Sequence, residues 1–269
     1  MKTRFLMMGA LIVLMVTACS KDDKNSSSDG SSDFISSTNV DVISDDVSQI
    51  VELESDETTP SNRLASSADN FLSDCAQVTT QVSGNTVTRT INFGETNCTL
   101  NNGNTVRGKI ILTFTNDWTA ATRTINYSFE NFYHNDNHVE GNRSVVKTIL
   151  DNGHPQANIS LNMTVTTPNN SVYTVEGNRI REFVEGYGNG ILADNVFQIQ
   201  GSWSTTLPNG NVHSHTINEA TPLRIIYSCN QVLGRHRFEI VSGILTIVKN
   251  TRTAVIDYGD GQCDNQGTI

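Results

Sequence analysis

Four histidines have a spacing that suits metal binding. His213 and His215 flank one serine, so in a β-strand they would point to the same face. His134 and His138 lie with Asp136 in a polar, loop-like stretch, and such groups bind zinc or copper when they converge. The sequence shows no third anchor, so we expect exposed histidines on a strand and a loop, with no metal and no cofactor.

Two groups of acidic residues are further candidates for chemistry. Asp257, Asp260 and Asp264 surround two glycines and offer oxygen atoms to Ca²⁺, but they do not follow the Asp-x-Asn/Asp-x-Asn/Asp-Gly loop pattern. We expect a solvated turn in which these aspartates accept backbone hydrogen bonds. Glu182 and Glu185 are a carboxylate pair of the type that glycosidases use, but alternation in a strand places them on opposite faces.

The sequence contains no Gly-x-Ser-x-Gly elbow, phosphate-binding loop or His-Glu-x-x-His motif, and we therefore predict that the protein is not an enzyme. Trp118 follows Asn116-Asp117 in a predicted hairpin turn. It is the aromatic residue that we expect to be exposed and able to bind a ligand such as a sugar ring. Trp203 and Tyr127 fall on the apolar sides of their strands, which predicts core positions.

Four cysteines lie in two pairs of similar surroundings. Cys75-Ala-Gln-Val resembles Cys229-Asn-Gln-Val, and the segments that end at Cys98 and Cys263 share the pattern Ile-x-aromatic-Gly-acid-x-amide-Cys. This similarity suggests a duplication and predicts the disulfides Cys75–Cys98 and Cys229–Cys263, each worth roughly 3–4 kcal/mol. Reduced or cross-paired cysteines are the alternative. No Cys-x-x-Cys spacing indicates a metal site.

A second short similarity relates Val139-Glu-Gly-Asn-Arg143 to Val175-Glu-Gly-Asn-Arg179. It predicts a repeated strand–turn element with glycine at a bulge or at a positive φ, unless the five residues recur by chance.

From Cys75 to the end of the chain, apolar and polar residues tend to alternate. Residues 157–166 alternate at every position, which is typical of a half-buried strand. After Tyr127 and Phe129 the pattern slips by one toward Phe132, as a β-bulge would cause. Roughly ten to twelve strands joined by short turns predict an all-β domain over 75–269. An antiparallel meander sheet and a barrel-like fold both fit this pattern.

A short amphipathic helix is predicted over residues 39–56, docked on the β-domain because an isolated helix of this length is barely stable. Ser44, Asp45 and Asp46 would suit its N-terminal cap. Residues 57–74 have a polar linker composition, and residues 19–38 are so rich in Ser, Asp and Gly that we expect a flexible tether. The apolar residues of the helix are Ile43, Val47, Ile50 and Val51.

The N-terminus carries a short basic region and an apolar run over residues 5–16, which is the length of a secretory signal. The run ends in Val16-Thr17-Ala18-Cys19. This ending resembles the lipobox of bacterial lipoproteins, which implies that residues 1–18 are a signal peptide and that Cys19 is acylated, with palmitate among its acyl chains. Several acyl chains would anchor the protein firmly to a membrane.

Lys21, Asp22 and Asp23 follow the cysteine closely. They resemble the acidic surface-export signal of Bacteroidota lipoproteins, which implies an outer-membrane protein that faces outward. A charged beginning to the tether is the alternative.

The net charge of −10 becomes −12 when Lys2 and Arg4 leave with the signal peptide, which argues against a nucleic-acid partner. We therefore expect a lipid-anchored, surface-facing envelope protein with a non-catalytic binding or structural role, and an extracellular glycan or protein as a possible partner. The alternatives are a glycan- or ligand-binding accessory of nutrient uptake and a periplasmic carrier of lipid or lipoprotein.

Overall fold

The computed structural model describes residues 27–56, 63–64, 72–189, 191, 194–227, 229, 239–264 and 266–269. The predicted signal peptide, the lipidation site Cys19 and the export signal at Lys21, Asp22 and Asp23 lie outside the described residues. Most of the predicted linker over 57–74 also lies outside them.

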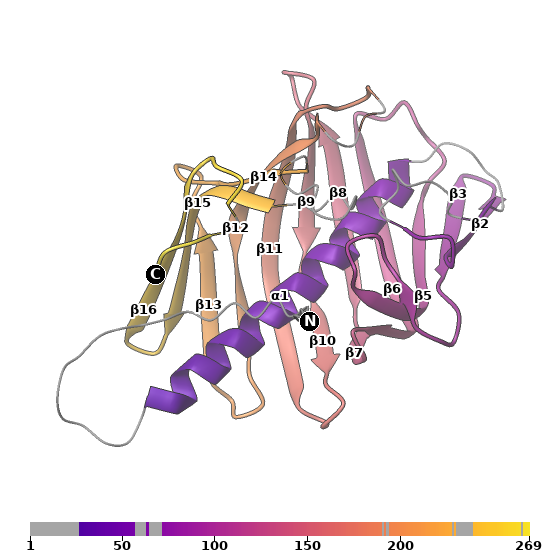
Figure 1. The fold of residues 1–269 in the computed structure, drawn as a ribbon. Coiled ribbons are helices and arrows are strands. Elements are labelled where there is room, and N and C mark those ends of the chain that lie inside the picture. Colours follow the sequence, from indigo (N-terminus) through magenta and orange to yellow (C-terminus); the bar gives the residue numbers. More distant parts are fainter. Residues whose placement is uncertain are drawn as a thin grey trace, which may run out of the picture.

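One antiparallel sheet contains all sixteen strands of the described chain (Figure 1). In space the strands follow the order β1-β2-β3-β5-β6-β7-β10-β11-β12-β13-β15-β14, and the remaining strands pair beside this path. The strands are β1 (Arg63–Leu64), β2 (Gln77–Ser83), β3 (Thr86–Asn92), β4 (Cys98–Thr99), β5 (Thr105–Thr115), β6 (Thr122–His134), β7 (Asn137–Glu140), β8 (Asn142–Ile149), β9 (Pro155–Ser160), β10 (Met163–Thr166), β11 (Val172–Glu185), β12 (Val196–Thr206), β13 (Val212–Ile217), β14 (Leu223–Ile226), β15 (Glu239–Lys249) and β16 (Arg252–Asp260).

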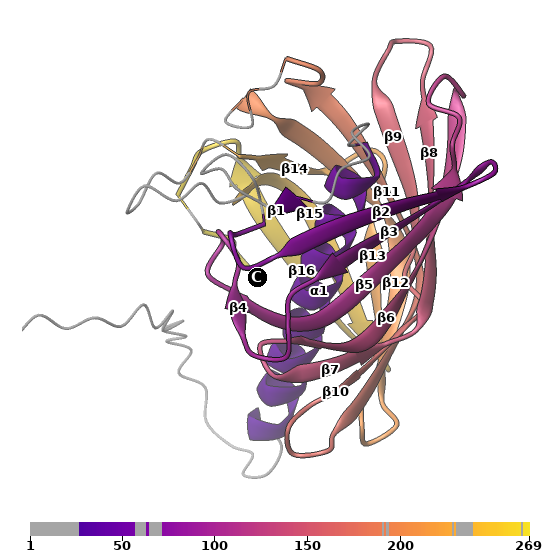
Figure 2. The ribbon, with the colours of Figure 1, turned by 90° about the vertical axis from the view of Figure 1, so that its right-hand side faces the viewer.

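The predicted all-β class with antiparallel pairing and one N-terminal helix is confirmed. The sheet is strongly curved (Figure 2). Within the described residues it does not close on itself, because β1 pairs with no strand other than β2 and β16 with no strand other than β15. The strands outnumber the predicted ten to twelve, partly because two-residue strands such as β1 and β4 are too short to show a period.

Alternation along the chain correctly predicts which side chains enter the core. The apolar residues of the 157–166 segment are all buried, although the segment forms two strands, β9 and β10, instead of one. The predicted slip near Phe132 is also present. The register of β5 and β6 shifts between Arg107 and Lys109, and Asn131 adopts a φ of 47° opposite the shift.

Helix α1 (Ser27–Asp56) lies across the concave face of the sheet (Figures 1 and 2). Its apolar stripe is buried as predicted, with exposed fractions of at most 3%. The helix begins at Ser27 instead of residue 39, so residues 27–38 of the predicted tether are helical. Ser44, Asp45 and Asp46 therefore lie inside the helix and not at its N-terminal cap. No helix in the described part of the chain has both the length and the apolar character needed to cross a membrane.

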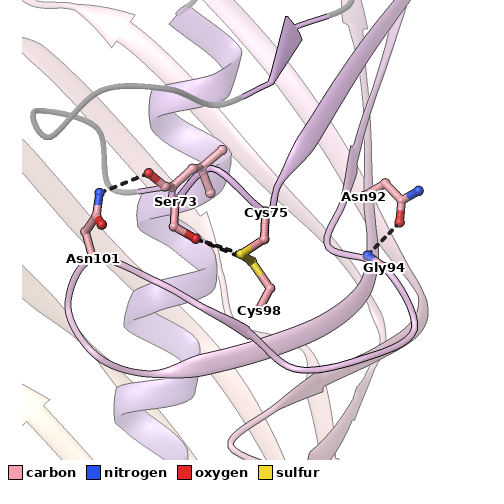
Figure 3. The surroundings of a disulfide bond; sticks show 7 residues. Ser73, Cys75, Asn92, Gly94, Cys98 and Asn101 are labelled. Atoms are coloured by element: carbon pink, nitrogen blue, oxygen red, sulfur yellow. Dashed lines mark hydrogen bonds between the residues drawn. A yellow bond between two sulfur atoms is a disulfide. The ribbon is translucent and has the colours of Figure 1, made fainter.

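The two disulfides have the predicted pairing, Cys75–Cys98 and Cys229–Cys263. Cys75 precedes β2, and Cys98 begins β4, which pairs with the first two residues of β5. Ser73 contacts the first disulfide, with its Oγ 2.9 Å from Sγ of Cys75 (Figure 3). This disulfide therefore ties the segment that follows the helix to the N-terminal side of the sheet.

Candidate functional site

The interface between α1 and the sheet is the most densely charged part of the described interior. From residue 41 to residue 56, α1 has six acidic residues and neither lysine nor arginine. The concave face of the sheet supplies the opposite charge from β3, β6, β8 and β11, which explains why so polar a helix can be buried. These basic residues are Arg89, Arg123, Arg143, Lys147, Arg179 and Arg181.

Asp41 lies at the centre of one cluster in this interface. Its Oδ1 accepts hydrogen bonds from Nη2 of Arg179 at 3.0 Å and from Nε1 of Trp203 at 2.7 Å. His215 Nδ1 lies 3.3 Å from Oδ2 of the same carboxylate. The indole of Trp203 is in ring contact with both neighbours, since the Arg179 guanidinium lies 3.8 Å from its centroid and the His215 ring is stacked at 5.0 Å.

Burial shifts the protonation of this cluster in opposite directions for its acid and its base. It raises the pKa of Asp41 from 3.8 to about 7, against the opposing charge of Arg179. It lowers the pKa of His215 from 6.5 to about 3, helped by the positive charge of Arg179. The His215 imidazole is therefore neutral at physiological pH. Asp45, which also pairs with Arg179, adds negative charge beside Asp41.

The five-residue similarity explains how two of these arginines reach the helix. In both copies the valine is fully buried, the glycine has a positive φ (135° at Gly141 and 140° at Gly177), and the arginine points into the concave face. Arg143 of β8 donates from Nη2 to Ser44 Oγ at 3.1 Å, and Arg179 of β11, two strands further on, donates from Nη2 to the Asp41 carboxylate at 3.0 Å. The predicted positive-φ glycine is thus confirmed in both copies.

Glycine is required at these positions because the neighbouring strand comes very close. A Cβ on Gly177 would lie 2.5 Å from both the Ser202 carbonyl oxygen and Trp203 Cα. A Cβ on Gly141 would lie 2.7 Å from the Asn162 carbonyl oxygen. The close approach sets the strand position from which each following arginine extends to α1.

Three of the four candidate histidines are buried under α1, so the prediction that they are exposed is wrong. His213 and His215 do share one face of β13, as predicted, but this face is the concave one that the helix covers. His134 is also fully buried, and its Nε2 lies 2.7 Å from Oδ2 of Asp46. Only His138 is partly exposed, with its ring 4.7 Å from that of Tyr133.

The candidate histidines do not form a metal centre in the structure. His213 pairs with Ser37 of α1, at 3.1 Å between Nδ1 and Oγ. Within the described ranges, no three or more His, Cys, Asp or Glu side chains are placed to hold a metal ion together.

The other predicted candidates are separate from the helix interface. Glu182 contacts His154 and Glu185 pairs with Arg224, so each carboxylate has its own partner. Asp257, Asp260 and Asp264 are exposed. Asp257 and Asp264 accept hydrogen bonds from the backbone N–H groups two residues further on, as expected for a solvated turn.

Trp118 is half-buried instead of exposed. Its ring makes an edge contact with Phe114 at 5.7 Å, and the Arg123 guanidinium lies 4.7 Å from its centroid. The indole Nε1 donates to Asn116. Trp118 is therefore packed against Phe114 and Arg123 and is not an exposed ring on which a sugar could stack. Trp203 and Tyr127 are core residues, as predicted.

A pocket of about 410 Å³ opens between α1 and the C-terminal half of the sheet. The sheet side is largely apolar and comes from β9, β12, β14 and β15, together with Tyr227, while β11 adds Arg179 and Arg181. The opposite wall is the polar side of α1, and the β4–β5 loop closes one end with Asn102 and Asn104. The volume is in the range of sites for small molecules. Four isoleucines contribute to the apolar wall: Ile159, Ile199, Ile225 and Ile240.

The residues that build this site carry only a faint signal in the sequence. The arginines that hold α1 are scattered over four strands, and only the repeated Val-Glu-Gly-Asn-Arg segment marks two of them. The isoleucines of the pocket look like any other residues of an alternating strand.

Comparison of the chain with protein-family models, with curated proteins and with solved structures gives no significant match.

Proposed function

We propose that the chain is a lipid-anchored protein of the bacterial outer membrane that faces outward and has a non-catalytic binding role. The pocket beside α1 is the observation that supports binding, because it combines an apolar wall with a polar one and is large enough for a small molecule. The anchor is proposed from the lipobox-like ending at Cys19, and the outward orientation from Lys21, Asp22 and Asp23.

The position of α1 links these two parts of the proposal. The helix begins eight residues after Cys19, so a lipid on that cysteine would hold the sheet close to the membrane through α1 and not through a long tether. One side of the same helix lines the pocket. The binding site would therefore lie on the segment that follows the anchor.

The anchor is tested by labelling the producing bacterium with an alkyne analogue of palmitate. The chain should incorporate the label and partition with the outer membrane, while the Cys19→Ala variant should lose both properties. Incorporation that is equal in the two chains would contradict lipidation at Cys19.

The orientation is tested by treating intact cells with protease and detecting residues 75–269 with an antibody. Loss of this signal, while a periplasmic control protein survives, is the expected result. Lys21→Ala, Asp22→Ala and Asp23→Ala together should restore protection if these residues direct export. Protection of the unsubstituted chain until the outer membrane is broken would contradict outward orientation.

The periplasmic-carrier alternative calls for a continuous apolar interior in the curved sheet. The concave face instead holds α1 and its buried ion pairs, such as Arg179 with Asp41 and Arg181 with Glu52. This interior favours a defined pocket beside the helix over a channel for a lipid chain through the sheet.

A further inference from the structure

The apolar wall of the pocket continues the core of the sheet without being fully covered. Ile159 and Ile199 are buried, whereas Ile225 and Ile240 are only partly buried. Tyr227 is also part of this wall and is 4% exposed. A small apolar molecule bound here would extend the packing of these side chains and remove their remaining surface from water, which is favourable by about 25 cal/mol per Å².

The two cationic side chains that line the pocket are paired with carboxylates of α1. Arg179 pairs with Asp41 and Asp45, and Arg181 lies 3.4 Å from Glu52.

Asp46, on the same wall, accepts hydrogen bonds from Asn102 and Asn104 and contacts His134. An anionic ligand would therefore lose its hydration without gaining an available cation, which is unfavourable. The lining disfavours an anion, and the isoleucine wall disfavours any charged group packed against it.

Gln49 adds a polar requirement to the same pocket. It lies on the α1 wall and is 7% exposed, and its Nε2 has no hydrogen-bond partner among the described residues. The last torsion of a glutamine side chain is broad, so its rotation can turn this N–H donor toward a ligand. A buried amide donor without an acceptor is unfavourable, and a ligand oxygen would remove this cost.

We infer that the pocket binds an uncharged amphipathic small molecule, whose apolar body packs on the isoleucine wall and whose carbonyl or hydroxyl oxygen accepts a hydrogen bond from Gln49. This inference rests on the proposed binding role and specifies its ligand class. It assigns specificity to three features on one side of α1: an apolar wall, paired charges and one donor.

Prodan is a suitable probe, because it is an uncharged naphthalene with a single ketone and its emission reports both apolar surroundings and hydrogen bonding to that ketone. The full chain carrying Cys19→Ala, which cannot be acylated at that position, is titrated with prodan. A parallel titration uses anilinonaphthalene sulfonate, an anion of similar size. We expect saturable binding of prodan at one site, with blue-shifted emission, and at least tenfold weaker binding of the anion.

Three variants connect this binding to the pocket. Ile225→Trp fills the pocket and should reduce prodan affinity at least tenfold, whereas Val255→Trp, at an exposed position on β16, should leave it unchanged. Gln49→Leu keeps a similar volume without the donor. It should weaken binding about 2- to 10-fold and remove the hydrogen-bonded component of the emission. Ile240→Trp replaces Ile225→Trp if that variant does not fold.

The inference is overturned if prodan does not bind saturably, if Ile225→Trp and Val255→Trp bind it equally, or if the anion binds more tightly. An unchanged affinity and emission in Gln49→Leu would overturn the assigned donor. These results are independent of the labelling and protease experiments. Intact acylation and exposure without prodan binding would count against the ligand class alone, and prodan binding without acylation would count against the anchor alone.

Discussion

Asp41 and Arg179 are separated by 138 positions in the chain, yet Nη2 of Arg179 donates to Oδ1 of Asp41 at 3.0 Å. The pair joins the middle of α1 to the centre of the sheet, and both side chains are almost completely buried. Burying two charges is costly, so such a pair is stable only while both partners are present. Helix and sheet are therefore matched in charge as well as in shape.

The first prediction follows from this dependence. Arg179→Met keeps the apolar part of the side chain but leaves Asp41 buried without its cation. We expect the free energy of unfolding to fall by about 3–5 kcal/mol in urea denaturation. Lys109→Met is the matched control, because Lys109 pairs with Glu130 at the surface, where a salt bridge is worth about 0–1 kcal/mol. Equal losses in the two variants would contradict a larger cost of breaking the buried pair than of breaking a surface pair.

The second prediction concerns pH and the contact between Asp41 and His215. Because the pKa of Asp41 is raised to about 7 in the folded chain, the folded state holds an extra proton between about pH 4 and 7. Its contribution to the free energy of unfolding therefore falls as pH rises through this window. The pKa of His215 is lowered to about 3, so below about pH 6.5 the unfolded chain holds the extra proton, and this contribution rises with pH.

The two slopes oppose each other in the unsubstituted chain and separate in single variants. Relative to that chain, Asp41→Asn should gain stability as pH rises from 4 to 7, by up to about 1.4 kcal/mol per pH unit. His215→Asn should show the opposite relative slope between pH 3 and 6.5. Urea denaturation at a series of pH values measures both. Parallel curves for the three chains would contradict the shifted pKa values.

The sequence predicts local features of this fold better than long-range ones. Alternation identified the strands, and the matching surroundings of Cys75 and Cys229 identified the disulfides, because both signals lie within a few residues of chain. The sequence does not predict the full length of α1, since polar residues before position 39, such as Ser37, look solvent-exposed. Ser37 and Asp41 are buried because the sheet curves around them and supplies arginines and histidines from distant strands.

The same reason explains the misplaced histidines. Alternation correctly put His213 and His215 on one face of a strand, but no local pattern shows which face of a curved sheet is covered. The repeated Val-Glu-Gly-Asn-Arg segment stands out in the sequence, but its arginines could not be assigned to α1 from the sequence. Only the fold shows that the helix lies opposite them.

The third prediction tests the close strand contact at Gly177. Gly177→Ala and Gly210→Ala both place a side chain at a positive φ, which costs about 1–3 kcal/mol. Only the first also places a Cβ 2.5 Å from backbone atoms of the neighbouring strand, whereas Gly210 has open space. We expect Gly177→Ala to lower the free energy of unfolding clearly more than Gly210→Ala does. It should also weaken the Arg179 contact, seen as a smaller additional loss when Arg179→Met is combined with it. Equal effects of the two alanines would contradict the strand contact.

The fourth prediction concerns the Cys75–Cys98 disulfide, which closes a loop with a sequence separation of 23. Cys75→Ala removes the bond from its exposed end and leaves Cys98 buried, so little packing is lost. In the chain-entropy model the loss is about 3–4 kcal/mol, because the unfolded chain regains the freedom of that loop. Thermal or urea unfolding under oxidising conditions measures it. Under reducing conditions the unsubstituted chain and the variant should converge, since both then lack the cross-link. A difference that persists after reduction would mean that Cys75 acts through packing and not through the disulfide.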